Sequence, residues 1–456
     1  MPQAWGKSNV EEPAMNRTRD IFKPRSLLGQ CKKYFTQTLK DSTPRRKGKF
    51  SPTDIAMSGL AIFHLKYQSL LQFDRDRQTE PNIRHNLQTL YQVQNAPCDT
   101  YMRERLDDVP PPDIQGSLKP IITTMQRSKA LEQWKYFGEK YLVPLDGTGF
   151  FTSNEVHCSH CTQKIHNKGK KDEYTSYHHN MLVGTIASPE MRQVLPLFYE
   201  PIVNADGVTK NDCELNASKR WLAGFRHLYP QLPSIIVGDA LYANGPFIQE
   251  LEKNRCSYIL GVKDDGHKNL LNYFWAGETP DIEEYKTKSK DKTKTISYRW
   301  MKDVPLNDAH PDILVIVVHV KETDAKGAIV YKGSWITNLK INIHNICQFV
   351  KAARGRWKIE NETFNTLKNQ GYNFEHNYGH GNNNLSNNLA GLMLLSFLID
   401  QVLQAMNLEF REILDKWKSK CHLWEKIRSK FFEFFVMSWD ALYSAIIRPP
   451  PMYLVD

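Results

Sequence analysis

The stretch Tyr141–Phe151, YLVPLDGTGFF, is the part of the chain from which the fold can be inferred. An apolar run leads to a single carboxylate, Asp146, and small residues that tolerate turns follow it. Side chains alternate between the two faces of a strand, so this run predicts a strand of the core. A carboxylate in such a run is costly unless it is paired or binds a metal. Asp146 is therefore either a strand-end residue that caps a turn at Gly147 or Gly149, or part of a functional site.

Length and composition restrict the class of protein. The chain has 456 residues, 41% of them hydrophobic and 24% charged, which fits a globular protein of two to four domains. Its net charge of +10 favours a polyanionic partner, nucleic acid first and an anionic membrane surface second. The longest apolar run, Leu389–Ile399, is too short for a membrane helix, so no membrane is expected. Eight cysteines are too sparse for a disulfide scaffold.

The residues after Asp146 predict alternating strands and helices. Two strand patterns are followed by a helix, and the short apolar run Ser234–Gly238 then predicts a strand buried on both faces that ends in Asp239. This order predicts a mixed sheet with helices on its faces. The expected elements are strands at 177–187, 194–199, 234–238 and 258–261, and helices at 210–225 and 246–254.

Composition shifts divide the chain into six segments. The second of them is a basic helical block that suits DNA binding, with an N-cap signal at Ser51–Asp54 and a long helix expected over 114–138. The β-rich insertion is expected to be mostly separate from the core sheet. The segments are a basic flexible arm (1–50), the helical block (51–138), the first part of the core (139–263), the insertion (264–340), the second part of the core (341–402) and a helical C-terminal region (403–456).

Three carboxylates stand out together. Asp146 lies on the first core strand, Asp239 ends a later strand, and Glu360 lies in RGRWKIENETFNTLK (354–368), which predicts a helix. A first strand and a non-adjacent later strand can lie side by side in a mixed sheet, and a helix across their ends can bring a third acid to them. Three oxygen ligands without His or Cys suit Mg²⁺ or Mn²⁺. Two such ions can activate the attacking oxygen and stabilise the leaving oxygen in phosphodiester chemistry.

This arrangement resembles the DDE transposases of bacterial insertion sequences, whose core is RNase H-like and carries a β insertion. The third acid of one large group lies in a Tyr-x2-Arg-x3-Glu-x6-Lys pattern, and Arg356-x3-Glu360 matches it. Ala353 stands at the tyrosine position and Lys368 falls one residue late. Glu362, six residues before Lys368, is therefore the alternative third acid. The resemblance covers about residues 140–400.

The resemblance implies a function and roles for these acids. Asp146, Asp239 and Glu360 would bind two divalent ions, and water and then a DNA 3′-hydroxyl would attack phosphorus. The expected partners are double-stranded DNA, at the transposon ends and at the target, and a second copy of the chain. The expected location is the bacterial cytoplasm, at the nucleoid. The alternatives are a metal-dependent nuclease without strand transfer and a DNA-binding derivative that is no longer catalytic.

The resemblance also implies DNA contacts, each with a structural alternative. Arg356 would contact a phosphate at the transposon end, or would only pair with Glu360 one turn later. Lys368 would contact a phosphate, or would lie on a solvated face. Trp300 or Trp335 of the insertion would stack on a flipped base, or would belong to the core.

A pair of close cysteines suggests a second metal. Cys158-x2-Cys161 has the spacing of half a zinc site. We expect His179 and Cys213 to complete it, and the alternative is two thiols in a hairpin. Other side chains that offer ligands nearby are His157, His160, His166 and His178. The polar stretch 370–388 is expected to be a loop, either along DNA or before a core helix at 389–402.

Overall fold

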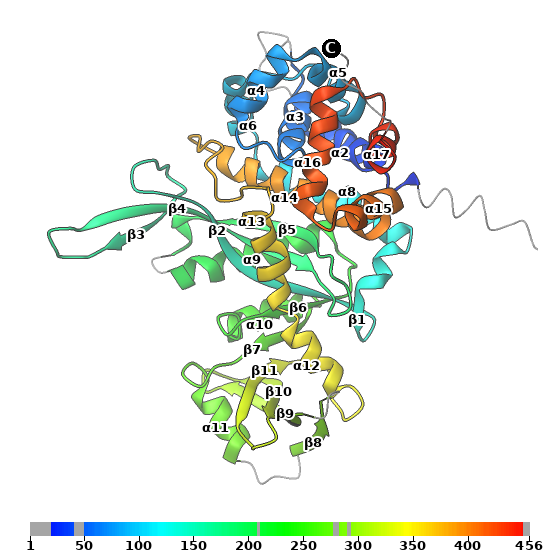
Figure 1. Ribbon diagram of the computed structural model, residues 1–456. Helices are drawn as coiled ribbons and strands as arrows, with labels where there is room; N and C mark the ends of the chain where they lie inside the picture. The colour runs from blue at the N-terminus through cyan, green and yellow to red at the C-terminus, as the bar shows by residue number, and fades with distance from the viewer. Residues whose placement is uncertain (1–19, 41–49, 208–209, 277–281, 290–292, 450–456) are drawn as a thin grey trace, which may run out of the picture.

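A computed structural model describes residues 20–40, 50–207, 210–276, 282–289 and 293–449. One continuous sheet runs through the molecule, with a block of helices at one end and the insertion at the other (Figure 1). The basic flexible arm was predicted over 1–50; residues 1–19 and 41–49 lie outside the described residues, and Pro24–Thr38 forms helix α2 instead of irregular chain.

The core sheet has the predicted order of strands and helices. Strands β2, β4 and β5 form an antiparallel meander, helix α9 follows, and β6, α10 and β7 complete the core. A short strand, β1, pairs with the start of β2, and β3 forms a hairpin with β4. The bounds are β1 Lys135–Phe137, β2 Lys140–Ser153, β3 Thr162–His166, β4 Tyr174–Ile186, β5 Leu195–Ile202, α9 Lys210–Leu228, β6 Ser234–Gly238, α10 Gly245–Lys253 and β7 Ser257–Gly261.

Strands β2 and β6 are parallel neighbours, an arrangement that the sequence analysis considered possible for two strands that are not adjacent in the chain. Their paired residues run from Tyr141 opposite Ser234 to Pro144 opposite Val237, a constant offset of 93 positions (234 − 141 = 237 − 144 = 93). The same offset leads from Asp146 to Asp239. The pairing therefore delivers both carboxylates to the same level at the carboxyl ends of two neighbouring strands.

The insertion is not separate from the core sheet, and that expectation was wrong. Its strand β11 pairs antiparallel with β7, with Trp335 opposite Gly261, so the sheet continues through the insertion. Strand β7 would otherwise present an unpaired edge. A helix, α11, also lies within this β-rich segment. The bounds are α11 Lys268–Ala276, β8 Ile282–Lys288, β9 Thr295–Asn307, β10 His310–Thr323 and β11 Ile329–Thr337.

The helices before and after the core share one hydrophobic core. Helix α3 starts as predicted, because Ser51 Oγ accepts a hydrogen bond from the Asp54 N–H at 3.0 Å. The helix expected over 114–138 is divided into shorter pieces. The N-terminal elements are α2 Pro24–Thr38, α3 Pro52–His64, α4 Leu70–Thr79, α5 Pro81–Tyr91, α6 Asp99–Asp107, α7 Pro111–Gln115, η1 Gly116–Leu118, α8 Lys119–Arg127 and η2 Ala130–Trp134; the C-terminal ones are α14 Leu385–Met406, α15 Leu408–Trp417, α16 Lys420–Glu433 and α17 Trp439–Ile447.

Helix α14 is the centre of this helical block, and it contacts α3, α6, α7 and α15. It is long and apolar enough to cross a membrane, but 89% of its most apolar window is buried inside the protein. This burial is what a core helix requires, so its apolar surface is accounted for by packing within the fold.

A buried ion pair joins the two halves of the helical block. Lys66, just after α3, places its Nζ 2.7 Å from Asp400 Oδ2 on α14, and both side chains are buried. His64 Nε2 lies 3.1 Å from the other carboxylate oxygen, and the Tyr372 hydroxyl donates to Asp400 as well. Burial lowers the pKa of Lys66 to about 8, against the opposing effect of Asp400.

Removing one partner of this pair should be costly. We expect Asp400→Leu to lower the free energy of unfolding by about 3–5 kcal/mol, because it leaves the buried Lys66 charge without a partner. The double variant Lys66→Met/Asp400→Leu should recover most of that loss, because both charges are gone. Urea unfolding followed by circular dichroism measures both. The exposed pair Lys302–Glu283, at 2.7 Å, serves as control, and its loss should cost about 1 kcal/mol or less. A double variant as unstable as Asp400→Leu would contradict this account.

Candidate functional site

The two aspartates lie at the end of the β2–β6 pair. Asp146 is partly buried, with 26% of its side chain exposed, and its Oδ1 accepts a hydrogen bond from the Gly147 N–H at 3.0 Å. Asp239 directly follows β6, and its Oδ1 accepts from the Leu241 N–H at 2.9 Å. Burial raises the pKa of Asp146, Arg356 lowers it, and the nearby charge of Asp239 raises it. The two acids therefore share one electrostatic environment.

Arg356 comes to this pair from the segment predicted to cross the strand ends. It follows helix α12 (Ile346–Arg354), and its Nη1 donates to Asp146 Oδ2 at 2.8 Å. The sequence also allowed an ion pair between Arg356 and Glu360. Among the described residues, Arg356 instead forms its ion pair with Asp146.

Glu360 lies in a π-helical turn, which is wider than a turn of α-helix. Residues Ile359–Phe364 form a π-helical segment, η4, which contacts β2 and β4 and continues into α13 (Asn365–Asn369). The Glu360 side chain is exposed. The carboxylate oxygens of Asp146, Asp239 and Glu360, all of them described residues, do not all lie within 4.8 Å of one another. The structure thus brings the two aspartates together and places Glu360 on the adjoining helix.

The alternative third acid, Glu362, faces a different neighbourhood. Burial lowers the pKa of Lys358 and of Lys420, and the charge of Glu362 opposes this effect at both lysines, while the charges that shift the pKa of Asp146 are Arg356 and Asp239. Lys358 itself is buried and donates to the Met191 carbonyl. Neither Glu360 nor Glu362 is among the groups that shift the pKa of Asp146, so these contacts do not choose between them as the third acid.

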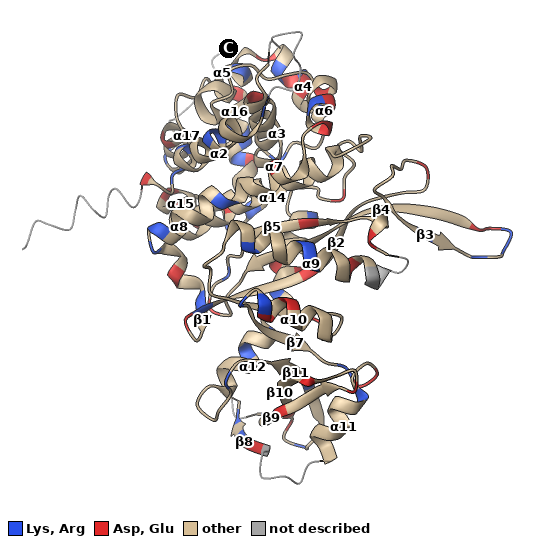
Figure 2. Cartoon of the chain, turned by 180° about the vertical axis from the view of Figure 1, so that it is seen from behind, with Lys and Arg blue, Asp and Glu red and all other residues tan. Residues whose placement is uncertain are grey.

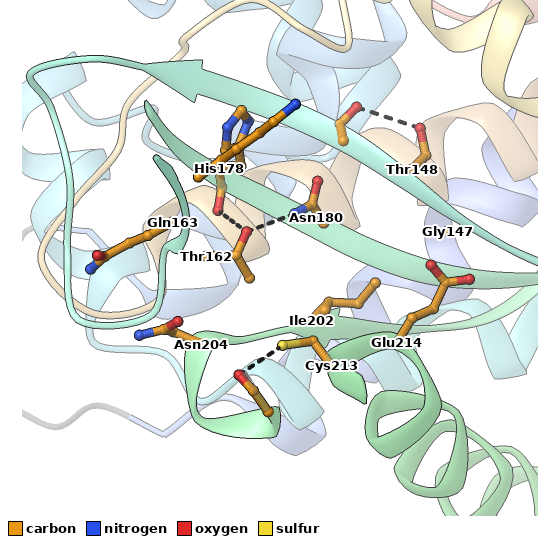
Figure 3. A pocket seen from close by; sticks show the side chains of 13 residues that line it. Gly147, Thr148, Thr162, Gln163, His178, Asn180, Ile202, Asn204, Cys213 and Glu214 are labelled. Carbon is orange, nitrogen blue, oxygen red and sulfur yellow. Dashed lines mark hydrogen bonds between the residues drawn. The ribbon is translucent and has the colours of Figure 1, made fainter. Parts of the chain in front are cut away.

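A further acid near the aspartates was not predicted. Glu214 projects from α9 toward Gly147, as Figure 3 shows, and a Cβ on Gly147 would lie 3.1 Å from Glu214 Oε2. The Tyr242 hydroxyl donates to Glu214 Oε1 at 2.7 Å. The pKa of Tyr242 is raised by burial and by the charges of Glu214, Asp146 and Asp239, which places this tyrosine among three acids. No spacing in the sequence links Glu214 to Asp146, because their proximity depends on how α9 packs over the sheet.

A cavity opens beside these acids. It has a volume of about 470 Å³ and is lined by the middle of β2, by β3 and β4, and by the start of α9 (Figure 3). Gly147 and Glu214 form the side nearest to Asp146. The Cys213 thiol also lines it and donates to the Gly207 carbonyl at 3.3 Å.

The donor set of the acids fits a hard divalent cation. Asp146 and Asp239 offer carboxylate oxygens at one strand level, and Glu214 and Glu360 lie on the two helices beside them. Oxygen ligands of this kind suit Mg²⁺ or Mn²⁺.

Three predicted DNA contacts have protein partners or are buried. Lys368 Nζ lies 2.7 Å from Glu375 Oε1, an ion pair within the chain. Trp300 and Trp335 are only 1% and 8% exposed, so their rings belong to the core and are not free to stack on a base. The cause is strand alternation, which turns both toward the packed face. Two other tryptophans are exposed, Trp357 at 45%, next to Arg356, and Trp275 in the insertion.

The cysteine pair does meet two imidazoles. The Sγ atoms of Cys158 and Cys161 lie 3.9 Å apart, and His179 Nε2 lies 3.6 and 3.4 Å from them. The fourth member is His380 and not Cys213, with its Nε2 3.3 Å from Cys161 Sγ and 3.1 Å from His179 Nε2. All four ligand atoms lie within 4.8 Å of one another. His380 was missed because it lies about 200 positions from His179, in the polar stretch predicted to be a loop.

The β3–β4 hairpin carries a lysine-rich tip. It projects from the body of the molecule, and its tip is blue in Figure 2, which marks Lys and Arg. Lys164, Lys168, Lys170 and Lys171 are all exposed there. The two acids of the tip are held within the turn: Asp172 accepts from the Asn167 amide and Glu173 from the Gly169 N–H. We call residues 162–178 the hairpin arm.

Comparison with known proteins gives one family match. The family model of the transposase DDE domain matches residues 139–398, more than half of the chain, and this range contains Asp146, Asp239, Glu360 and the insertion. None of the curated protein sequences matches the chain. Among solved structures, the cryo-EM structure of the piggyBac transposase synaptic complex with hairpin DNA is similar at 10% identity and a TM-score of 0.38. The match covers 96% of this chain and 82% of that chain. A TM-score this low supports no inference from that complex.

Proposed function

Because the chain belongs to the family of transposases with a DDE domain, we propose that it cuts DNA at the ends of a bacterial insertion sequence and joins them to target DNA. The observation that carries this proposal is the common level of Asp146 on β2 and Asp239 just after the parallel strand β6, with Arg356 beside Asp146. The protein would work in the bacterial cytoplasm, at the nucleoid.

We infer that Mg²⁺ or Mn²⁺ would be held by Asp146, Asp239 and Glu360. Bound divalent ions supply activation of the attacking oxygen and stabilisation of the leaving oxygen in phosphodiester chemistry. The chain's own residues have other tasks: Arg356, which pairs with Asp146, would contact a phosphate oxygen, and Tyr242 holds Glu214 in orientation.

DNA is the partner that the charge distribution suits. The net charge is +10, the hairpin arm extends four exposed lysines, and Trp357 presents an exposed ring next to Arg356. Lysine and arginine side chains that neutralise phosphates provide most of the sequence-independent affinity for DNA. A dimer that holds two element ends completes the proposal.

A strand-transfer assay tests the function. Full-length protein is incubated with Mg²⁺, labelled DNA that carries the inverted repeats bordering its reading frame, and a target plasmid. Joined products support the proposal. Nicks without joining would point to a metal-dependent nuclease, and a shifted but intact duplex would point to a DNA-binding protein without catalysis.

Each acid of the triad should be essential in this assay. We expect Asp146→Asn, Asp239→Asn and Glu360→Gln each to abolish cleavage and to leave DNA binding largely intact, because each removes a ligand charge without changing shape. The matched control is Glu362→Gln, two residues further along the same helix, which should keep its activity. Cleavage that survives in Glu360→Gln but is lost in Glu362→Gln would reverse the assignment of the third acid.

Glu214 should support the two aspartates without being essential. We expect Glu214→Gln to slow cleavage about 10–100-fold, the usual effect of changing a group in the outer shell of a metal site. Tyr242→Phe removes only the hydroxyl that holds Glu214 and should have a smaller effect in the same direction. Single-turnover cleavage rates over a series of Mn²⁺ concentrations measure both. An unchanged rate in Glu214→Gln at every Mn²⁺ concentration would exclude this role.

The hairpin arm should contribute charge to DNA binding. We expect replacement of Lys168, Lys170 and Lys171 by alanine to weaken binding equally for all DNA sequences. The slope of log K against log salt should fall by about 0.9 for each phosphate that the arm no longer neutralises. Fluorescence anisotropy over a salt series measures this slope, and the wild-type and variant affinities should converge at high salt. An unchanged slope would show that the arm does not bind phosphates.

A further inference from the structure

Four metal-ligating side chains converge at the base of the hairpin arm, away from the proposed catalytic acids. Cys158 and Cys161 precede β3, His179 lies on β4, and His380 lies in the segment between α13 and α14. We propose that Cys158, Cys161, His179 and His380 bind one zinc ion, which fixes the base of the arm to the segment that follows the Glu360 helix. This site is independent of the proposed chemistry at Asp146 and Asp239.

Five of the six distances between the ligand atoms are close to those of a tetrahedral zinc site. With Zn–S near 2.3 Å and Zn–N near 2.05 Å, a tetrahedron separates two sulfurs by about 3.8 Å, sulfur and nitrogen by about 3.6 Å, and two nitrogens by about 3.3 Å. The measured distances are 3.9 Å for the two sulfurs, 3.3–3.6 Å for three sulfur–nitrogen pairs and 3.1 Å for the two nitrogens. The sixth distance, from Cys158 Sγ to His380 Nε2, lies within 4.8 Å.

The chemistry of the four ligands selects zinc. Two thiolates and two imidazoles, with the two cysteines separated by two residues, form one of the usual structural zinc sets. Thiolates are poor ligands for Mg²⁺. A disulfide is the competing state of two close cysteines, but its sulfurs would lie about 2.05 Å apart and not 3.9 Å.

The surroundings orient one imidazole for metal binding. His380 Nδ1 lies 2.8 Å from the Gly381 carbonyl oxygen, which can only accept, so Nδ1 carries the proton and Nε2 is left with its lone pair. His179 and Cys161 are buried, and the rings of Phe150 and Phe151 pack against the two histidines. Apolar rings around a metal site exclude water and lower the local dielectric constant, which strengthens the bonds between an ion and its ligands.

Zinc at this place would tie together segments that are distant in the chain. His380 lies next to residues 382–385, whose backbone N–H groups donate to the Asp107 carboxylate at 2.8–3.0 Å. The ion would therefore connect the arm through His380 to the start of α14 and to α6. Its loss would free both the arm and the segment 370–384.

The metal content of the full-length protein tests the site directly. Protein purified without added zinc and without chelator should contain about one zinc per chain by mass spectrometry of the metal. Replacement by Co²⁺ should give the thiolate charge-transfer band and the intense visible bands of a tetrahedral site. Protein with all its thiols reduced that contains no zinc and takes up no Co²⁺ would overturn the proposal.

Variants identify the ligands. Cys161→Ser and His380→Ala should each lose the zinc. Cys213→Ser and His178→Ala are matched controls from the same region, and both should keep it. Circular dichroism checks that each variant is folded; where one is not, the cobalt spectrum of the wild-type protein still decides. Zinc retained in the folded double variant Cys161→Ser/His380→Ala would refute the assignment.

Hydrogen exchange tests the tether. Removal of zinc by chelation should speed amide exchange in residues 156–166 and in residues 376–384 together, although these segments lie more than 200 positions apart. Faster exchange in the first segment alone would show that the ion does not bind the second. The exchange readout does not depend on DNA cleavage, so its result and that of the strand-transfer assay can differ.

Discussion

The parallel pairing of β2 with β6 is the constraint on which the rest of the site depends. Two buried strands that are distant in the chain pair with one fixed offset, and that offset puts Asp146 and Asp239 at one level. Every other group of the site is positioned relative to this edge. Arg356 approaches it from the segment after α12, and Glu214 approaches it from α9 with Tyr242 as its support. A shift of two residues in the pairing would keep the faces but separate the acids.

The segment between the Glu360 helix and α14 is held from three sides. Tyr372 donates to the buried Asp400, His380 joins the cysteine cluster, and Asp107 accepts the backbone N–H groups of residues 382–385. These contacts connect the sheet, the N-terminal helices and the core helix α14. The helical block and the sheet therefore cannot be displaced independently without breaking these polar contacts, of which the Tyr372–Asp400 hydrogen bond is buried and so the most costly to lose.

The sequence predicted what local patterns control. The alternation and apolar runs of the core gave the order of strands and helices, and the N-cap at Ser51 gave the start of α3. Features that depend on long-range packing were not predictable. His380 lies far from the cysteines in sequence, Glu214 is one acid among many on exposed helices, and β11 closes on β7 across the whole insertion. Trp300 and Trp335 were placed by their location in the insertion, but only the sheet decides which face is packed.

The π-helical segment at Ile359–Phe364 lies between Arg356 and Lys368, the lysine that falls one residue later than in the Tyr-x2-Arg-x3-Glu-x6-Lys pattern. A π turn closes from residue i to i+5 and so takes up one residue more than an α turn. One extra residue between Glu360 and Lys368 can thereby be taken up within a single turn, without rotating the helix that follows. An insertion that would rotate an ordinary helix by about 100° is neutral here. The spacing of a motif on a helix matters because it sets the angle between side chains around the helix axis. A π turn can therefore lengthen such a motif by one residue and keep that angle.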